Sequence, residues 1–139
     1  MRRNARGFTL IELMIVLVVA AIIITIAIPA FTSQMRKSRR SEVLSQLQSL
    51  ALNQEQYRAS NVSYASNAQL TTFVGAAAMT STHYTLAVSG ESATGYTITG
   101  TAKLGDDQNN DKASGSTCAA LTLVSLNGSV SKSPTSCWQ

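Results

Sequence analysis

Residues 7–31 read GFTLIELMIVLVVAAIIITIAIPAF, and Glu12 is the only charged residue in this stretch. Because about 20 consecutive apolar residues suffice to cross a bilayer as a helix, the stretch predicts a membrane-spanning segment. A carboxylate at membrane depth costs at least about 2.5 kcal/mol even on the most lenient insertion scale. We therefore expect the Glu12 carboxylate to have an interaction partner and a functional role. The alternative is that its side chain reaches back to the interface from the first turn of a plain anchor.

The 139 residues are enough for one domain, and roughly 100 remain for a folded head beyond the apolar helix. The net charge of +4 comes from the N-terminal part, because residues 1–40 contain seven cationic residues and one acid. From Ser41 onward four cationic residues stand against six acidic ones, so the head has a formal charge of −2. A nucleic-acid-binding domain usually carries a concentrated basic face, and this composition gives no sign of one.

Cys118 and Cys137 are the two cysteines of the chain. Paired cysteines suit an oxidising compartment, which indicates that the C-terminal part is exported. A bridge between them would contribute about 3 kcal/mol in the chain-entropy model. The alternative is two free thiols in a cytosolic protein.

One very long helix is predicted from Phe8 to about Ser60. Its first half is apolar on all sides, as a membrane helix must be. Pro29 removes one backbone donor there, so we expect a kink or a soft turn. In the second half, residues recur at spacings of three and four, which indicates a helix face that covers a sheet: Val43, Leu44, Leu47, Leu50, Ala51, Gln54 and Tyr57.

Alternating runs that begin at Tyr84, Tyr96 and Leu121, with a weaker run around Val130, predict antiparallel strands. Asn127-Gly128 is a strong hairpin signal between the last two. From residue 61 to Ser81 we expect turns and loop. The predicted fold class is α+β: a long N-terminal helix packed on a four-stranded antiparallel meander. The expected domains are a hydrophobic helix with its basic flank, 8–40, and a globular head, 41–139.

The run from Arg6 to Leu13, RGFTLIEL, resembles the leader and mature start of a type IV prepilin. The resemblance implies that residues 1–7 are a leader, cut between Gly7 and Phe8 by a membrane peptidase that also methylates Phe8. It implies that Glu12 pairs with the methylated amine of a neighbouring subunit and sets the filament register. It also implies that the helix around Pro29 can lose helical structure when subunits pack.

The physics of these residues supports that pairing. After the cut, a free amine lies about one helical turn from Glu12. Opposite charges attract strongly in an apolar medium, and each is costly alone. We expect that only the N-terminal amine of another subunit pairs with the Glu12 carboxylate. Such pairing would favour assembly of the subunits.

A second resemblance concerns the C-terminal tail. It implies the C-terminal loop of the pilin fold, which is closed by a disulfide. The tail is similar to the end of type IVa minor pilins, including competence-type DNA-uptake pilins, at Asp111, Cys118, Leu121, Leu123, Gly128 and Cys137-Trp138. The resemblance implies that the bridged segment is a surface loop that carries the contacts particular to each pilin.

No enzyme is expected from this chain. His83 is its only histidine, and we expect the ring to face solvent at the start of a strand. The sequence has no Gly-rich phosphate loop, no HExxH and no GxSxG. The cysteines are too far apart for a CxxC motif. We therefore predict no catalytic residue and no cofactor.

A weak calcium candidate lies at Asp107, Asn109 and Asp111, which copy the first three ligand positions of a calcium loop. The copy then fails, because Lys112 stands at the sixth position and Cys118 at the twelfth. A turn-rich polar loop explains the pattern as well, so no metal site is predicted.

DNA is the other ligand to weigh. Three lysines, Lys103, Lys112 and Lys132, could gather beside the bridged loop, with Trp138 offering a stacking surface. Against this, three acids in the same region would repel phosphate: Asp106, Asp107 and Asp111.

The sequence thus predicts a structural, minor subunit of a type IV pilus, with a role in adhesion, twitching motility or DNA uptake. We expect it in the bacterial inner membrane before assembly, its head in the periplasm, and at the cell surface in the pilus. Its expected partners are other pilin subunits, the prepilin peptidase and N-methyltransferase, and the inner-membrane assembly platform. Two alternatives stay open: a DNA-uptake receptor pilin and a type II secretion pseudopilin.

Overall fold

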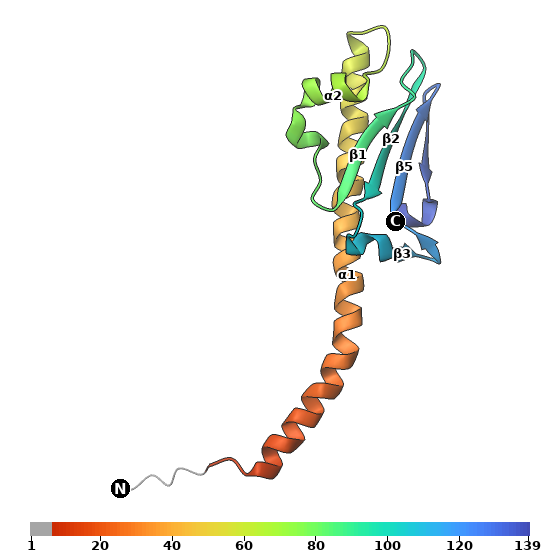
Figure 1. The fold of residues 1–139 in the computed structure, drawn as a ribbon. Helices are drawn as coiled ribbons and strands as arrows, with labels where there is room; N and C mark the ends of the chain where they lie inside the picture. The colour runs from red at the N-terminus through yellow and green to blue at the C-terminus, as the bar shows by residue number, and fades with distance from the viewer. Residues whose placement is uncertain (1–6) are drawn as a thin grey trace. The chain divides into compact units, whose positions relative to one another are not determined.

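The computed structural model describes residues 7–139 (Figure 1), so of the predicted leader all but Gly7 lies outside the described residues. The chain divides into two compact units, with the boundary between Met35 and Arg36. The functional boundary that we expect after residue 40 stays a prediction.

Helix α1 spans Leu10–Ala59, 50 residues, close to the predicted limits. Its N-terminal half is long and apolar enough to cross a membrane, with a mean hydropathy of 3.0 over 18 residues. Pro29 lies inside the helix, which is continuous through it. Because proline has no N–H, the carbonyl of Thr25 lacks its usual donor four residues later. The hydroxyl of Thr32 donates to the Pro29 carbonyl at 3.0 Å.

The second unit contains a four-stranded antiparallel sheet in the order β1-β2-β5-β6. Its strands are β1 (Tyr84–Ser89), β2 (Gly95–Ala102), β5 (Ala120–Leu126) and β6 (Ser129–Ser133). The pairing aligns Val88 with Ile98, Ile98 with Leu123, and Leu123 with Lys132. The predicted four-stranded sheet and its Asn127-Gly128 turn are therefore confirmed.

A small insertion interrupts the meander between β2 and β5. It consists of the 3-10 turn η2 (Asp107–Asn110) and a separate two-stranded sheet of β3 (Lys112–Ala113) and β4 (Ser116–Thr117). A last turn, η3 (Thr135–Trp138), ends the chain. These short elements were not predicted, because two-residue strands have no alternating pattern to detect.

The predicted loop between α1 and β1 is wrong in part. Helix α2 spans Asn67–Val74, and η1 spans Ala76–Met79. Ser66 caps α2: its backbone N–H donates to Gln69, whose own N–H donates to the Ser66 hydroxyl. This reciprocal pattern is a capping box, and the spacing Ser-x-x-Gln was a readable signal for it.

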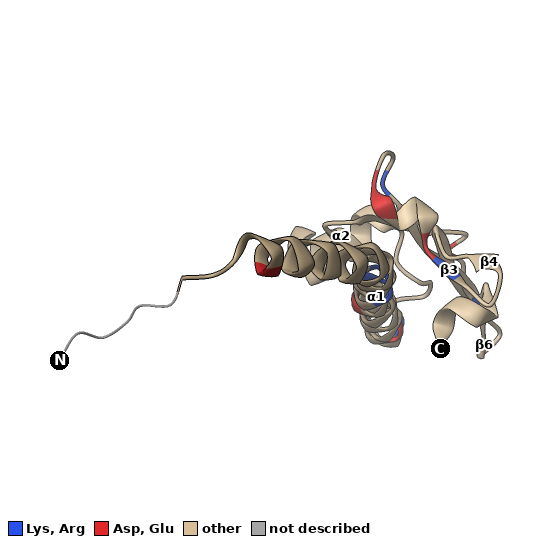
Figure 2. Cartoon of the chain, turned by 90° about the horizontal axis from the view of Figure 1, so that it is seen from below, with Lys and Arg blue, Asp and Glu red and all other residues tan. Residues whose placement is uncertain are grey.

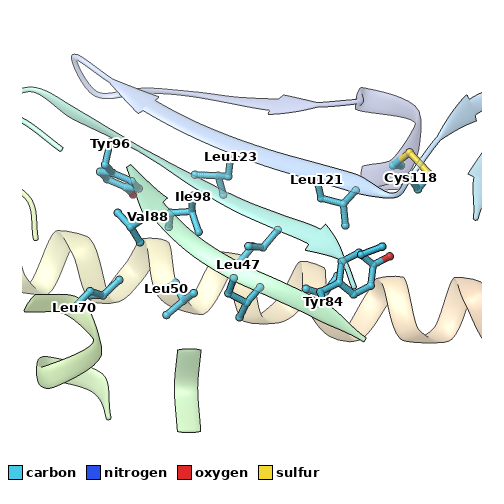
Figure 3. Close-up of a cluster of buried hydrophobic side chains, with 14 of the residues drawn as sticks. Leu47, Leu50, Leu70, Tyr84, Val88, Tyr96, Ile98, Cys118, Leu121 and Leu123 are labelled. Atoms are coloured by element: carbon cyan, nitrogen blue, oxygen red, sulfur yellow. A yellow bond between two sulfur atoms is a disulfide. The ribbon is translucent and has the colours of Figure 1, made fainter. Parts of the chain in front are cut away.

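The core lies between the C-terminal half of α1 and one face of the sheet (Figure 3). Val43, Leu47 and Leu50 on α1 are at most 1% exposed. In Figure 3 the side chains of Leu47 and Leu50 point toward the strands, whose side chains, including those of Ile98 and Leu123, point toward the helix. The predicted helix face is confirmed. It also contains Gln54, whose buried amide both donates to and accepts from the Ala65 backbone at 2.8 Å.

Candidate functional site

Glu12 lies in the first turn of α1, whose apolar half is tan in Figure 2 apart from one acidic position, in red, near its start. The Thr9 backbone N–H and hydroxyl both donate to Glu12 Oε2, at 2.9 and 2.8 Å. The Glu12 backbone N–H donates to the Thr9 hydroxyl oxygen at 3.3 Å. This reciprocal arrangement is that of a capping box at a helix N-terminus.

The expectation that only another subunit can satisfy Glu12 is therefore wrong. The spacing Thr-x-x-Glu lets the carboxylate bind donors of its own first turn, and the sequence displayed that spacing. These hydrogen bonds do not cancel the charge. Since both go to Oε2, the oxygen Oε1 has no hydrogen-bond partner within residues 7–139.

The surroundings of Glu12 are apolar and open. Phe8 is 85% exposed and Leu13 is 56% exposed. These two residues, with Ile15 and Val16, line a shallow groove of about 500 Å³ beside the carboxylate. The groove is lined mainly by apolar side chains and lies next to the acid.

The second candidate region is the bridged C-terminal segment. Cys118 and Cys137 form the predicted disulfide, and both are fully buried. Within this segment, the ammonium of Lys132 lies 5.1 Å from the centre of the Trp138 ring. The Trp138 indole N–H donates to the Ser133 carbonyl at 3.3 Å. The structure thus joins one predicted cation with the predicted stacking residue.

The other two lysines do not join them. Lys103 donates its ammonium to the Ser81 carbonyl at 2.7 Å. Lys112 is exposed on β3, opposite Thr117. The predicted gathering of three lysines is not observed, and Lys132 with Trp138 is what the structure brings together.

Two acids of the η2 region pair with arginines of α1. Asp107 accepts two hydrogen bonds from the Arg36 guanidinium, both at 2.8 Å. One helical turn later, Arg40 Nη1 donates to Asp111 at 2.8 Å, and this pair is buried, 6% and 5% exposed. Arg40 Nη1 also lies 3.4 Å from Cys118 Sγ.

A third acid pairs with the only histidine. His83 Nδ1 lies 2.8 Å from Asp106 Oδ2, and the His83 side chain is 24% exposed. The expectation that this ring faces solvent is wrong, because its partner comes from the loop after β2, 23 residues later. All three acids that we expected to repel phosphate thus have a side-chain partner: an arginine for Asp107 and for Asp111, and the His83 ring for Asp106.

These contacts favour the ionised carboxylates. The Gln108 backbone N–H and the His83 ring hold the pKa of Asp106 below its usual value. The hydrogen bonds from Arg36 lower the pKa of Asp107 in the same way. Buried Gln108 also connects η2 to α1 and to β1. Its side-chain amide donates to the Arg36 carbonyl at 3.1 Å and to the Tyr84 hydroxyl at 2.9 Å.

The weak calcium candidate falls in this network. Asp107 and Asp111 each bind an arginine, and the Asn109 amide donates to the carbonyls of Lys103 and Asp106, both at 2.8 Å. Within the described part of the chain, no three His, Cys, Asp or Glu side chains are placed to hold a metal ion. That no metal binds here stays a prediction, and titration of the protein with calcium checks it.

Comparison with known families identifies the class. Residues 2–28 match the prokaryotic N-terminal methylation motif. Residues 29–122, more than half of the chain, match the family described as type IV minor pilin ComP, DNA uptake sequence receptor. The chain belongs to this family of type IV minor pilins. The resemblance to type IV pilins and the α+β pilin-like fold with its C-terminal disulfide are therefore confirmed.

One curated relative of this minor pilin is the type IV wide pilus major component PilA4 of Thermus thermophilus, 40% identical over 65 residues. The match covers 47% of the minor pilin, and it spans about half of the relative's length, 50%. No solved structure matches the chain significantly. The individual roles expected for Gly7, Phe8, Glu12 and Pro29 stay predictions.

Proposed function

We propose that this minor pilin is a structural subunit of a type IV pilus that is processed between Gly7 and Phe8 and joins the fibre through α1. The supporting observation is the single acid in the first turn of a membrane-length apolar helix, within a chain that matches the N-terminal methylation motif. The proposal assigns no catalytic step to the chain. The cut and the methylation belong to the prepilin peptidase and N-methyltransferase.

Assembly would use the two oxygens of Glu12 differently. Thr9 holds Oε2 and so keeps the first turn of α1 formed. Oε1 remains for the methylated amine of Phe8 from a neighbouring subunit. An ion pair in an apolar medium is strongly attractive. The exposed apolar groove beside Glu12 would receive the neighbour's first residues. The cap therefore does not have to break for the intermolecular pair to form.

Mass spectrometry of the protein purified from membranes tests this proposal. A mass that lacks residues 1–7 and carries one extra methyl group is the expected result. A protein that is intact from Met1 in a strain with an active prepilin peptidase would contradict it. The match to a minor pilin family favours a pilus over a type II secretion pseudopilus. We propose the inner membrane, with the head in the periplasm, as its location before assembly, and the assembly platform as a partner there.

A second candidate function is that of a DNA-uptake receptor, which the description of the matching family names. Two observations favour it: two of the three acids near the bridged segment are paired with arginines, and Lys132 lies over Trp138. A cation beside an aromatic ring suits phosphate and base contacts on single or frayed strands. The head's negative formal charge argues for weak, salt-sensitive binding.

Gel-shift titrations of the full chain in detergent test this candidate at several salt concentrations. We expect retardation of a DNA duplex at low salt that Lys132→Gln weakens. Lys37→Gln is the matched control, since it removes a cation elsewhere. Equal weakening by both variants, or no retardation of any duplex, would refute a site at Lys132 and Trp138.

A further inference from the structure

The buried Arg40–Asp111 pair also touches the disulfide, and none of the functions proposed above uses this contact. Arg40 Nη1 donates to Asp111 Oδ2 at 2.8 Å and to Cys118 Sγ at 3.4 Å. All three residues are at most 5% exposed. When the bridge is reduced, the Cys118 sulfur is a thiol or a thiolate, and at this position it lies against a guanidinium.

The sulfur of Cys137 has a neutral neighbour instead, the Thr117 carbonyl oxygen, at 3.7 Å. Because a carbonyl oxygen only accepts hydrogen bonds, this contact favours the protonated thiol, which can donate. A guanidinium only donates and carries a positive charge, so the contact of Cys118 favours the thiolate. Cys118 Sγ also lies 3.8 Å from the Ser116 carbonyl, but its contact with the cation is shorter and of the stronger kind.

Asp111 opposes the effect of Arg40 on Cys118, because a carboxylate disfavours a second negative charge nearby. That carboxylate binds the guanidinium, however, and the Asp111 backbone carbonyl is what meets Cys118, accepting its N–H at 2.9 Å. Among the other elements packed here, β4, β5 and η3 have no charged side chain. Strands β3 and β6 have one each, Lys112 and Lys132, and both are exposed. In the described part of the chain, Arg40 is therefore the charged group in contact with the Cys118 sulfur.

The two cysteines also differ in how firmly the head holds them. Cys118 lies between β4 and β5, within the core cluster that packs on α1. Cys137 lies on η3, a four-residue turn that packs on β3, β4 and β6 and has no other buried residue. A short turn with little buried surface opens at a lower free-energy cost than packed strands do. When η3 of the reduced chain opens, Cys118 is uncovered while Arg40 stays beside it.

We propose that Cys118 is the nucleophilic cysteine through which this disulfide forms, with Arg40 holding it as a thiolate. The Cys118 thiolate attacks one sulfur of an external disulfide. The S–S bond of that oxidant breaks, and its other sulfur leaves as a thiolate that takes up a proton. Cys137 then loses its thiol proton and attacks the Cys118 sulfur of the mixed disulfide, which expels the second thiolate of the oxidant. Two electrons thus pass from the two cysteines to the oxidant.

Reaction of the full chain in detergent with oxidised glutathione tests the proposal. Because Cys137 would resolve the mixed disulfide in the intact chain, the test uses two variants with a single cysteine, Cys137→Ser and Cys118→Ser. Mass spectrometry measures the rate of glutathione addition to each sulfur as a function of pH. The midpoint for Cys118 should lie about one pH unit below that for Cys137. At pH 7 its rate should be about threefold higher rather than tenfold, because a less basic thiolate is also a weaker nucleophile.

Two further changes in the Cys137→Ser background separate charge from structure. Arg40→Met removes the cation and should raise the pH midpoint of Cys118 toward that of an ordinary thiol, about 8.5. Asp111→Asn removes the opposing carboxylate and keeps the cation, so it should lower the midpoint. A merely structural role for the pair would move both midpoints in the same direction. Arg40→Lys restores a cation and should recover most of the effect.

Arg36→Met is the matched control, because Arg36 pairs with Asp107 one helical turn earlier and should leave the midpoint of Cys118 unchanged. Three results would overturn the proposal. They are equal midpoints for the two cysteines, a lower midpoint for Cys137, and shifts of the same sign from Arg40→Met and Asp111→Asn.

Discussion

The apolar half of α1 and the folded head both contain acidic residues, but the acids are hydrogen-bonded in different ways. Glu12 binds donors of Thr9, three residues away in the same turn. Asp107 and Asp111 bind Arg36 and Arg40, each 71 residues away. A local cap leaves the acid exposed and able to take a second partner. A long-range pair depends on the packing of the head, and the buried Arg40–Asp111 pair has no room for a second partner from outside the head. The first arrangement suits assembly, and the second suits stability.

The largest effect should come from Glu12→Val. Removing a costly charge from an apolar helix leaves insertion and cleavage intact, but it removes the partner for the neighbour's amine. We expect a processed protein in the membrane and almost none in sheared fibres, measured by immunoblot of both fractions. Thr9→Val is the control for the cap alone and should have a smaller effect on incorporation. Normal amounts of Glu12→Val in fibres would refute the intermolecular pair.

The next largest effect should come from Asp111→Asn. It leaves the Arg40 guanidinium buried without its counter-charge, which typically destabilises a protein by roughly 3–5 kcal/mol. Urea unfolding of the full chain in detergent, followed by the fluorescence of Trp138, measures the change. Asp107→Asn is the matched variant, because the same kind of pair there is partly exposed and screened by water. If both variants lose similar stability, burial is not what distinguishes the two pairs.

Reduction of the disulfide between Cys118 and Cys137 should cost about 3 kcal/mol, since it frees a loop with a sequence separation of 19. The same urea experiment, with and without a reducing agent, measures this loss. The apolar half of α1 lies outside the loop, so its helical circular dichroism in detergent should not change. A reduced head as stable as the oxidised one would show that packing alone holds the C-terminal segment.

The smallest effect should be a dependence of head stability on acid pH. The pKa values of Asp106 and Asp107 are lowered in the folded protein. Such groups stabilise the fold above their unfolded pKa of about 3.9, and this contribution is lost as pH falls through the lower folded values. Stability should therefore be flat from pH 7 to about 5 and fall below about 4. Asp107→Asn should make the fall shallower, and an unchanged slope would contradict the assignment.

The sequence alone was sufficient to predict the long helix, the face of it that covers the sheet, and the main strands. These features depend on periodicity, which every residue of an element repeats. It also indicated the disulfide, because two cysteines allow one bridge. The cap of Glu12 by Thr9 and the cap of α2 by Ser66 were readable from local spacing but were missed. Both need residues only three apart.

The remaining features were decided by the tertiary structure. Nothing in the sequence links Arg36 to Asp107, His83 to Asp106, or Lys132 to Trp138, because these contacts form only when packed elements bring distant residues together. The order of the sheet is of the same kind: alternation within a strand assigns each side chain to one face, but only the pairing of the strands sets which residues become neighbours across it. Local chemistry is encoded within a turn or a strand, whereas pairing across the chain depends on where the core places each element.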